Sequence, residues 1–192
     1  MKRLARRAVL TGAAGLVSLQ VWASSLPAEL RLALPAAALA GQAKLRFWGF
    51  EVYQASLWVA PEFTAADYAE HGFALELVYL RDFAGADIAE RSLAEMARQA
   101  PLGAGQASRW GGQMRALFPD VKAGQRLTGV HQPGVGARFM FNGQPLGEIA
   151  DAEFARRFFA IWLSPQTSEP GLRLALLQQL TPAAGAGLAT TP

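Results

Sequence analysis

The stretch that decides the fold is ARFMFNGQPLGEIADAEFARRFFAIWLSPQTSEPGLRLALLQQL, residues 137–180. Within it, Asn142-Gly143 separates two short apolar runs, 137–141 and 146–149. Asn-Gly supplies the two positive-φ residues that a tight hairpin turn needs. The pattern therefore predicts two antiparallel strands joined by a two-residue turn.

Two amphipathic helices are predicted after this hairpin. Asp151 is placed to cap the first helix, and Pro165 ends it because proline cannot continue the backbone hydrogen bonds. Ser168 is expected to cap the second helix. Apolar residues recur at helical spacing in both: Phe154, Phe158, Ile161 and Trp162 in the first, and Leu172, Leu176, Leu177 and Leu180 in the second. Two such stripes predict helices that cover a sheet.

The segment before the hairpin is predicted to contain an edge strand and a central strand. Residues 26–45 carry two prolines, which favour an irregular or edge-strand entry over a helix, and residues 41–43 suggest a turn. Residues 45–59 are apolar on both faces, which is typical of a central strand covered on both sides. Gly49 is expected to mark a bulge or a bend within that strand.

The middle of the chain adds strands and helices. Alternating side-chain character predicts strands at 73–81 and 126–131, and apolar residues at helical spacing predict helices at 86–99 and 106–118. The predicted inward residues are Ile88, Met96 and Ala97 in the first of these helices, and Trp110 and Met114 in the second. This order of elements favours an α+β fold with helices layered on an antiparallel sheet.

The first 23 residues resemble a signal peptide. A basic start is followed by a small, apolar run that is too short and too interrupted to span a membrane, and residues 21–23 resemble a cleavage site. We expect a signal peptide at 1–23, with cleavage after Ser25 as the alternative, the domain at 24–182 and a disordered tail at 183–192. The protein is then periplasmic or secreted, without a membrane span after processing. Arg6-Arg7 keeps the twin-arginine route open beside ordinary secretion.

Charge and cysteine content exclude several functions. Four of the 18 basic residues lie in residues 1–23, which hold no acid, so 14 basic and 15 acidic residues remain after processing. This balance gives no case for nucleic-acid binding. The chain has no cysteine, which excludes disulfides, thiolate metal sites and cysteine nucleophiles.

The sequence offers little catalytic or metal chemistry. The two histidines, His71 and His131, have no carboxylate or second histidine at ligand spacing, so no metal is expected. No Gly-x-Ser-x-Gly elbow is present. Residues 134–136 lack the third glycine of a dinucleotide loop and lead into a strand, so no cofactor is expected either.

Arg46 is the most interesting charged residue because its neighbours are aromatic. A buried arginine must find an anion or several acceptors, so Arg46 is a candidate anchor for the carboxylate or enolate of an apolar ligand. The alternative is a salt bridge with Glu51 or Glu76, or exposure at the strand end. Both interpretations stay open at this point.

Four segments together resemble the chalcone isomerase-like family, in particular its short bacterial exported branch. They are LRFWGFEVYQASLWV (45–59), LELVYLRDF (75–83), VKAGQRLTGVHQPGVGARFMFNGQPLGEI (121–149) and FARRFFAIWLSPQTSEPGLRLALL (154–177). The resemblance implies an open-faced β-sandwich: a long antiparallel sheet with helices on one face and a ligand cleft between the layers.

The resemblance also implies a polar set for the cleft. In the plant enzymes an arginine stabilises the reacting phenolate or enolate, and tyrosine, lysine and threonine or asparagine side chains position the flavonoid. In the fatty-acid-binding members an arginine and a tyrosine hold a carboxylate. Arg46 is the counterpart of the arginine, although its spacing to the following Val-Tyr pair differs by about one residue, and Arg81 is a candidate substitute for the lysine. The expected tyrosine is absent from 85–89 and the asparagine from 92–95, which argues against catalysis.

Three functions follow. The first is an exported, non-catalytic binding protein for a small amphipathic anion such as a fatty acid, with Arg46, Trp48, Tyr53, Arg81 and Trp110 as the binding residues. The second is an isomerase or lyase that uses Arg46 on an enone-type substrate. The third is an envelope structural or assembly partner without a small ligand.

Overall fold

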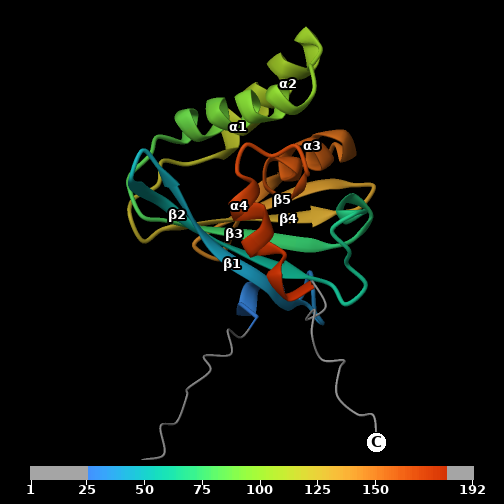
Figure 1. Cartoon of the computed structure of the whole chain (residues 1–192). Helices are drawn as coiled ribbons and strands as arrows, with labels where there is room; N and C mark the ends of the chain where they lie inside the picture. The colour runs from blue at the N-terminus through green and yellow to red at the C-terminus, as the bar shows by residue number, and fades with distance from the viewer. Residues whose placement is uncertain (1–25, 181–192) are drawn as a thin grey trace, which may run out of the picture.

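Six antiparallel strands form one sheet in which each strand pairs with its neighbours in the chain (Figure 1). The computed structural model describes residues 26–180. The strands are β1 (Ala38–Phe47), β2 (Phe50–Val59), β3 (Phe73–Tyr79), β4 (Arg126–Gln132), β5 (Gly136–Phe141) and β6 (Gln144–Ile149). The helices are α1 (Gly85–Gln99), α2 (Ala104–Leu117), α3 (Ala152–Leu163) and α4 (Pro170–Leu176), with short 3-10 turns η1 (Ala28–Leu30), η2 (Tyr68–Glu70) and η3 (Gln178–Leu180). The predicted α+β, open-faced architecture is confirmed.

All four helices lie on one face of this sheet. α3 packs against β4 and β5, α4 packs against β1, and α1 joins the layer through α2 and α3 (Figure 1). Strand alternation supplies the sheet side of the core, because β3 turns Phe73, Leu75, Leu77 and Tyr79 to this face. The other face carries a smaller apolar cluster around Leu30 and Trp58.

The local signals in residues 137–180 form the elements that they predict. Asn142 and Gly143 have φ values of 49° and 81° and join β5 to β6. The Asp151 carboxylate accepts the Phe154 N–H at 3.0 Å and caps α3, which ends at Leu163, two residues before Pro165. α4 differs at both ends. Glu169 holds the cap position while the Ser168 hydroxyl donates to Glu95, and the helix ends at Leu176, so that Leu180 lies in η3.

Residues 45–59 are not one central strand, and this prediction was wrong. The chain reverses at Trp48 and Gly49, whose φ values of 50° and 83° match those of the Asn142-Gly143 turn. β1 is therefore the edge strand and β2 its partner. The apolar pattern runs unbroken through the turn, and tryptophan occupies a position where asparagine or glycine is typical. For both reasons the sequence pattern does not indicate the hairpin.

The turn predicted at residues 41–43 was also wrong, because these residues lie inside β1. Only glycine fits at position 41, because the backbone of α4 passes close to it. A β-carbon would lie 2.7 Å from the Leu176 carbonyl carbon. In α1, Met96 is buried as predicted, Ile88 is partly buried, and Ala97 is exposed. Trp110 and Met114 of α2 are fully buried, as predicted.

The predicted signal peptide at 1–23 and tail at 183–192 lie outside the described residues. Within residues 26–180, no helix is long and apolar enough to cross a membrane.

Candidate ligand-binding cavity

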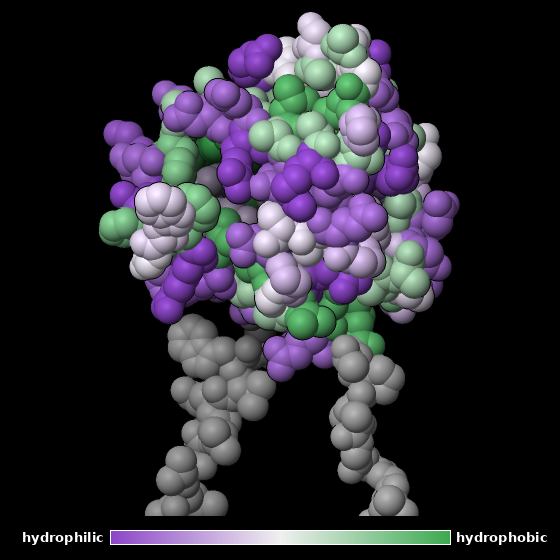
Figure 2. Space-filling view, turned by 45° about the horizontal axis from the view of Figure 1, so that its top comes forward, coloured by the Kyte–Doolittle hydropathy of each residue, from purple (hydrophilic) through white to green (hydrophobic). Residues whose placement is uncertain are grey.

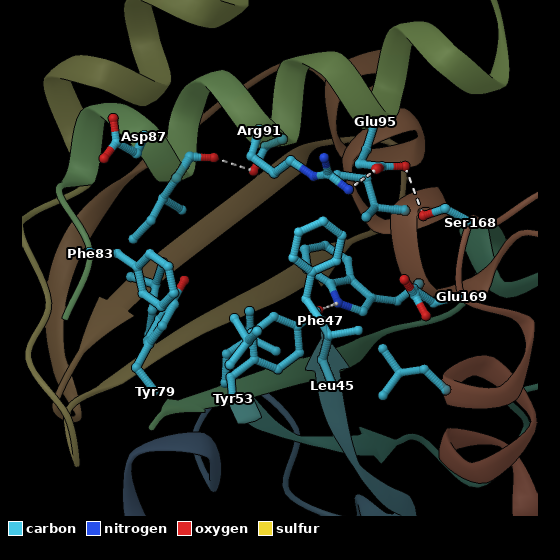
Figure 3. A pocket seen from close by; sticks show the side chains of 18 of the residues that line it. Leu45, Phe47, Tyr53, Tyr79, Phe83, Asp87, Arg91, Glu95, Ser168 and Glu169 are labelled. Atoms are coloured by element: carbon cyan, nitrogen blue, oxygen red, sulfur yellow. Dashed lines mark hydrogen bonds and ion pairs between the residues drawn. The ribbon is translucent and has the colours of Figure 1, made fainter. Parts of the chain in front are cut away.

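A cavity of about 430 Å³ lies between α1 and the sheet, beside α3 and α4 (Figure 3). Its volume falls within the range of about 300–1,000 Å³ that is typical of small-molecule sites. Most of its wall is apolar. The apolar and aromatic lining residues are Leu45, Phe47, Val52, Tyr53, Leu77, Tyr79, Phe83, Ile88, Phe118, Leu127, Phe158, Ile161, Trp162 and Leu172. The polar lining residues are Asp87, Arg91, Ser92, Glu95, Ser168 and Glu169.

Two tyrosines from neighbouring strands form part of the cavity floor. Tyr53 of β2 pairs directly with Tyr79 of β3, and their rings meet edge to face with centroids 6.1 Å apart. The Tyr53 hydroxyl accepts a hydrogen bond from the Trp162 Nε1–H at 2.9 Å, which leaves its own O–H free to donate. Burial raises the pKa of both tyrosine hydroxyls, so both stay protonated near neutral pH.

A cluster of charged groups on α1 forms the polar rim. Arg91 is the only basic residue among the described lining residues, and its Nη2 lies 2.7 Å from Glu95 Oε1 (Figure 3). The Glu95 carboxylate also accepts hydrogen bonds from Arg98 at 3.0 Å and Ser168 at 2.9 Å. Burial opposes ionisation of Glu95, but these hydrogen bonds and the charge of Arg91 outweigh it and hold its pKa below the ordinary range. Glu95 is thus a fixed anion that orients Arg91 across the rim.

The rim is acidic as a whole. Asp87, Glu95 and Glu169 supply three carboxylates against the single guanidinium of Arg91. Arg91 also lies over the Phe47 ring, with its Cζ 5.9 Å from the ring centroid, and its side chain is 65% exposed. The cavity therefore combines an apolar interior with a charged mouth, which suits a molecule that has an apolar body and a polar end.

A family model described as chalcone isomerase-like matches residues 20–178. This chain belongs to the chalcone isomerase-like family. A solved structure of a fatty-acid binding protein from Arabidopsis thaliana is similar to it, with a TM-score of 0.56 and 11% sequence identity over 76% of this chain and 91% of that one. At this identity the similarity shows a shared fold. No curated protein matches the sequence.

Of the five binding residues expected from the sequence, this chalcone isomerase-like structure places Tyr53 alone in the cavity wall. Arg46 lies outside the cavity wall, because it follows a register shift in β1 and turns to Glu51, with Nη2 and Oε1 2.8 Å apart and a side chain 69% exposed. The salt bridge that the sequence left open is the interaction that forms. Arg46 is therefore not part of the cavity wall in this structure.

The other three expected residues also lie outside the cavity wall. Trp48 is on the β1–β2 turn and is 86% exposed. Arg81 is exposed and lies over the Phe50 ring, with its Cζ 4.7 Å from the ring centroid. Trp110 of α2 is fully buried against Phe154 of α3, and its Nε1–H donates to Asp151 at 2.9 Å. The hairpin at Trp48-Gly49 accounts for the position of Trp48.

Two residues that sequence reasoning missed have central places in the cavity. Trp162 belongs to the predicted apolar stripe of α3, and nothing local shows that its Nε1–H reaches Tyr53. Arg91 stands one helical turn before Glu95, a spacing at which opposite charges pair on a helix. That pairing is visible in the sequence, but the packing of α1 over the sheet, which brings the pair to a cavity, is not.

His131 packs among aromatic side chains and does not line the cavity. Its ring stacks on Phe73 with centroids 4.8 Å apart, and its Nδ1 lies 3.0 Å from the His71 carbonyl oxygen. Within residues 26–180 no group of three or more histidine or acidic side chains is arranged to hold a metal ion.

Proposed function

We propose that this protein binds a small amphipathic anion, such as a fatty acid, with its tail in the cavity and its head group at the rim. The observation that carries the proposal is the apolar cavity with one guanidinium at its mouth and two neutral tyrosine hydroxyls in its wall. The similar Arabidopsis structure is of a fatty-acid binding protein, which supports the same class of ligand.

Arg91 takes the role of head-group anchor in this proposal. A ligand carboxylate can replace the Glu95 carboxylate as its partner, and Glu95 keeps the hydrogen bonds from Arg98 and Ser168 when that happens. The Tyr53 O–H supplies a second donor for a ligand oxygen that reaches deeper. A guanidinium with a hydroxyl donor is a combination that suits a carboxylate.

The acidic rim favours a second candidate ligand. Asp87 and Glu169 line the cavity and form no ion pair within residues 26–180, since Arg91 pairs with Glu95. A cationic or neutral head group would avoid repulsion from them. The chemistry of the head group therefore separates the two candidates, while the apolar tail is common to both.

The test is ligand binding measured by native mass spectrometry and calorimetry, with a fatty acid, an alkyl alcohol and an alkylamine of equal chain length. Tightest binding of the acid supports the proposal, and tightest binding of the amine replaces it with the second candidate. Failure of all three to bind, together with a clean unliganded mass after purification, overturns a role for the cavity in binding amphipathic molecules.

Arg91→Gln and Arg98→Gln form a matched pair for the anchor. Both arginines contact Glu95, but only Arg91 lines the cavity. A charge-assisted hydrogen bond discounted for the exposure of Arg91 is worth about 1 kcal/mol, or about fivefold in affinity for the acid. Arg98→Gln should change affinity by less than about twofold by the same reasoning. Equal effects of the two variants would remove Arg91 from the head-group site.

We also propose that the protein is exported before it acts. The basic, then apolar, residues 1–23 support this. N-terminal sequencing of the protein from a periplasmic fraction should find a start near residue 24. Recovery of the full chain from the cytoplasm alone would contradict export.

A further inference from the structure

The β1–β2 hairpin ends in three exposed aromatic side chains. Phe47, Trp48 and Phe50, here called the aromatic tip, are 51%, 86% and 59% exposed. Figure 1 shows this hairpin projecting from the sheet, and on the corresponding side Figure 2 shows a protruding part with pale and green atoms beside purple ones, next to a hollow. The other exposed large apolar side chains of residues 26–180, which are Leu32, Val135 and Leu174, lie apart from one another in the sequence.

The fold itself gives no reason for a tryptophan at position 48. The Asn142-Gly143 turn has nearly the same φ values and uses the residues that such a turn favours. A bulky residue at positive φ carries a conformational cost. In return Trp48 gains only a stacked contact with Phe47, with ring centroids 5.9 Å apart. Its large apolar surface is thus available to something outside the described chain.

Basic groups surround the aromatic tip. Arg81 lies over Phe50 and Arg91 over Phe47, with Cζ atoms 4.7 Å and 5.9 Å from the ring centroids. Lys44 and Arg46 both contact Glu51, at 3.1 Å and 2.8 Å. Lys44 and Arg46 share the single carboxylate of Glu51, and Arg81 forms no ion pair within residues 26–180. Basic groups therefore outnumber acidic ones on the hairpin side of the tip, while the cavity rim on its other side is acidic.

We propose that the aromatic tip docks on the surface of an anionic lipid bilayer. Tryptophan and phenylalanine favour the interfacial region of a bilayer, and arginine and lysine beside them pair with lipid phosphates. Charge complementarity selects an anionic surface over a neutral one. Phe47 belongs both to the tip and to the cavity wall, so docking places the cavity mouth at the lipid surface, where an amphipathic molecule can enter or leave.

Vesicle binding by the chain from residue 24 onward, which is the product of the processing proposed above, tests this surface. The vesicles are neutral phosphatidylcholine, alone or with roughly one third phosphatidylglycerol. Binding to the anionic vesicles should weaken as salt rises. Tryptophan emission should shift to the blue and be quenched by brominated lipid, because the remaining tryptophans Trp58, Trp110 and Trp162 are buried.

Trp48→Asn is the decisive variant, since it creates the same Asn-Gly pair that already forms a turn at residues 142–143. We expect its thermal midpoint to equal or exceed that of the parent chain, while binding to anionic vesicles falls at least tenfold and the quenching disappears. Arg81→Gln should weaken binding about fivefold. Val135→Asn is the control, because Val135 is 54% exposed but lies in the β4–β5 turn at the other end of the sheet.

The proposal is overturned if neither vesicle type binds, if Trp48→Asn binds as well as the parent chain, or if the tip instead mediates self-association that Trp48→Asn abolishes. Vesicle binding is measured without an added ligand, and ligand affinity is measured without vesicles. Failure of lipid docking and failure of cavity binding are therefore separate results.

Discussion

Asp151→Ala removes one carboxylate that serves three donors where α2 meets α3. Asp151 Oδ1 accepts the Phe154 N–H at 3.0 Å and so caps α3. Oδ2 accepts the Trp110 Nε1–H at 2.9 Å and an Arg109 N–H at 3.0 Å. The Trp110 side chain is fully buried, and Asp151 is the acceptor of its N–H, so removal of the carboxylate leaves this donor without its protein partner.

The expected loss in the free energy of unfolding follows from these three contacts. Removing a helix N-cap costs about 1 kcal/mol. Leaving a buried N–H donor without an acceptor costs about 1–3 kcal/mol. The half-exposed Arg109 pair adds at most about 0.5 kcal/mol. Asp151→Ala should therefore lower the free energy of unfolding by about 2–4 kcal/mol.

Urea denaturation followed by circular dichroism measures this change. Arg109→Gln should cost less than about 0.5 kcal/mol, and Asp151→Asn, which keeps an acceptor oxygen, should cost about 1 kcal/mol. A loss below about 1 kcal/mol for Asp151→Ala, or one equal to that of Arg109→Gln, would refute the role assigned to the Trp110 contact.

The pH dependence gives Asp151 a second readout. Burial opposes its ionisation, but the hydrogen bonds from Phe154, Trp110 and Arg109 lower its pKa overall. A lowered folded-state pKa means that the stabilisation is present above the unfolded pKa of about 4 and is lost as the pH falls through the folded value. Asp151→Ala should therefore lose less stability on acidification than the parent chain does.

Two further predictions concern packing and titration. Gly41→Ala should destabilise the fold by at least about 2 kcal/mol, because its β-carbon meets the backbone of α4 at Leu176. Gly112→Ala, in an open position of α2, should instead stabilise the fold by about 0.5–1 kcal/mol in the same denaturation assay. Equal effects of the two variants would contradict the close approach of α4 to Gly41. Burial lowers the pKa of His131 despite its contact with the His71 carbonyl, so the stability linked to neutral His131 is present above about pH 6.5 and is lost as the pH falls below it. Thermal midpoints between about pH 7 and 5 should show this loss, and His131→Phe should reduce it; an unchanged profile in that variant would assign the loss to other groups.

The sequence predicted the C-terminal half of the fold well because its signals are local. An Asn-Gly pair, an aspartate three residues before Phe154 and a proline after the helix each act over a few residues. The β1–β2 hairpin escaped prediction because its turn begins with Trp48, whose side chain continues the aromatic pattern of both strands. That missed turn pairs Arg46 with Glu51 and leaves Trp48 at the hairpin end, outside the cavity wall.

By itself, then, the sequence determined the α+β fold with its layer of helices, and Tyr53 as a wall residue. Only the tertiary structure decided that Arg91 stands at the cavity mouth, that Trp110 serves the α2–α3 junction, and that Trp48 is exposed at a hairpin end. The physical reason is the distance along the chain over which each signal acts. Periodicity and capping depend on neighbours along the chain, whereas this cavity depends on how contacts with α2 and α3 hold α1 above the sheet, which no local pattern specifies.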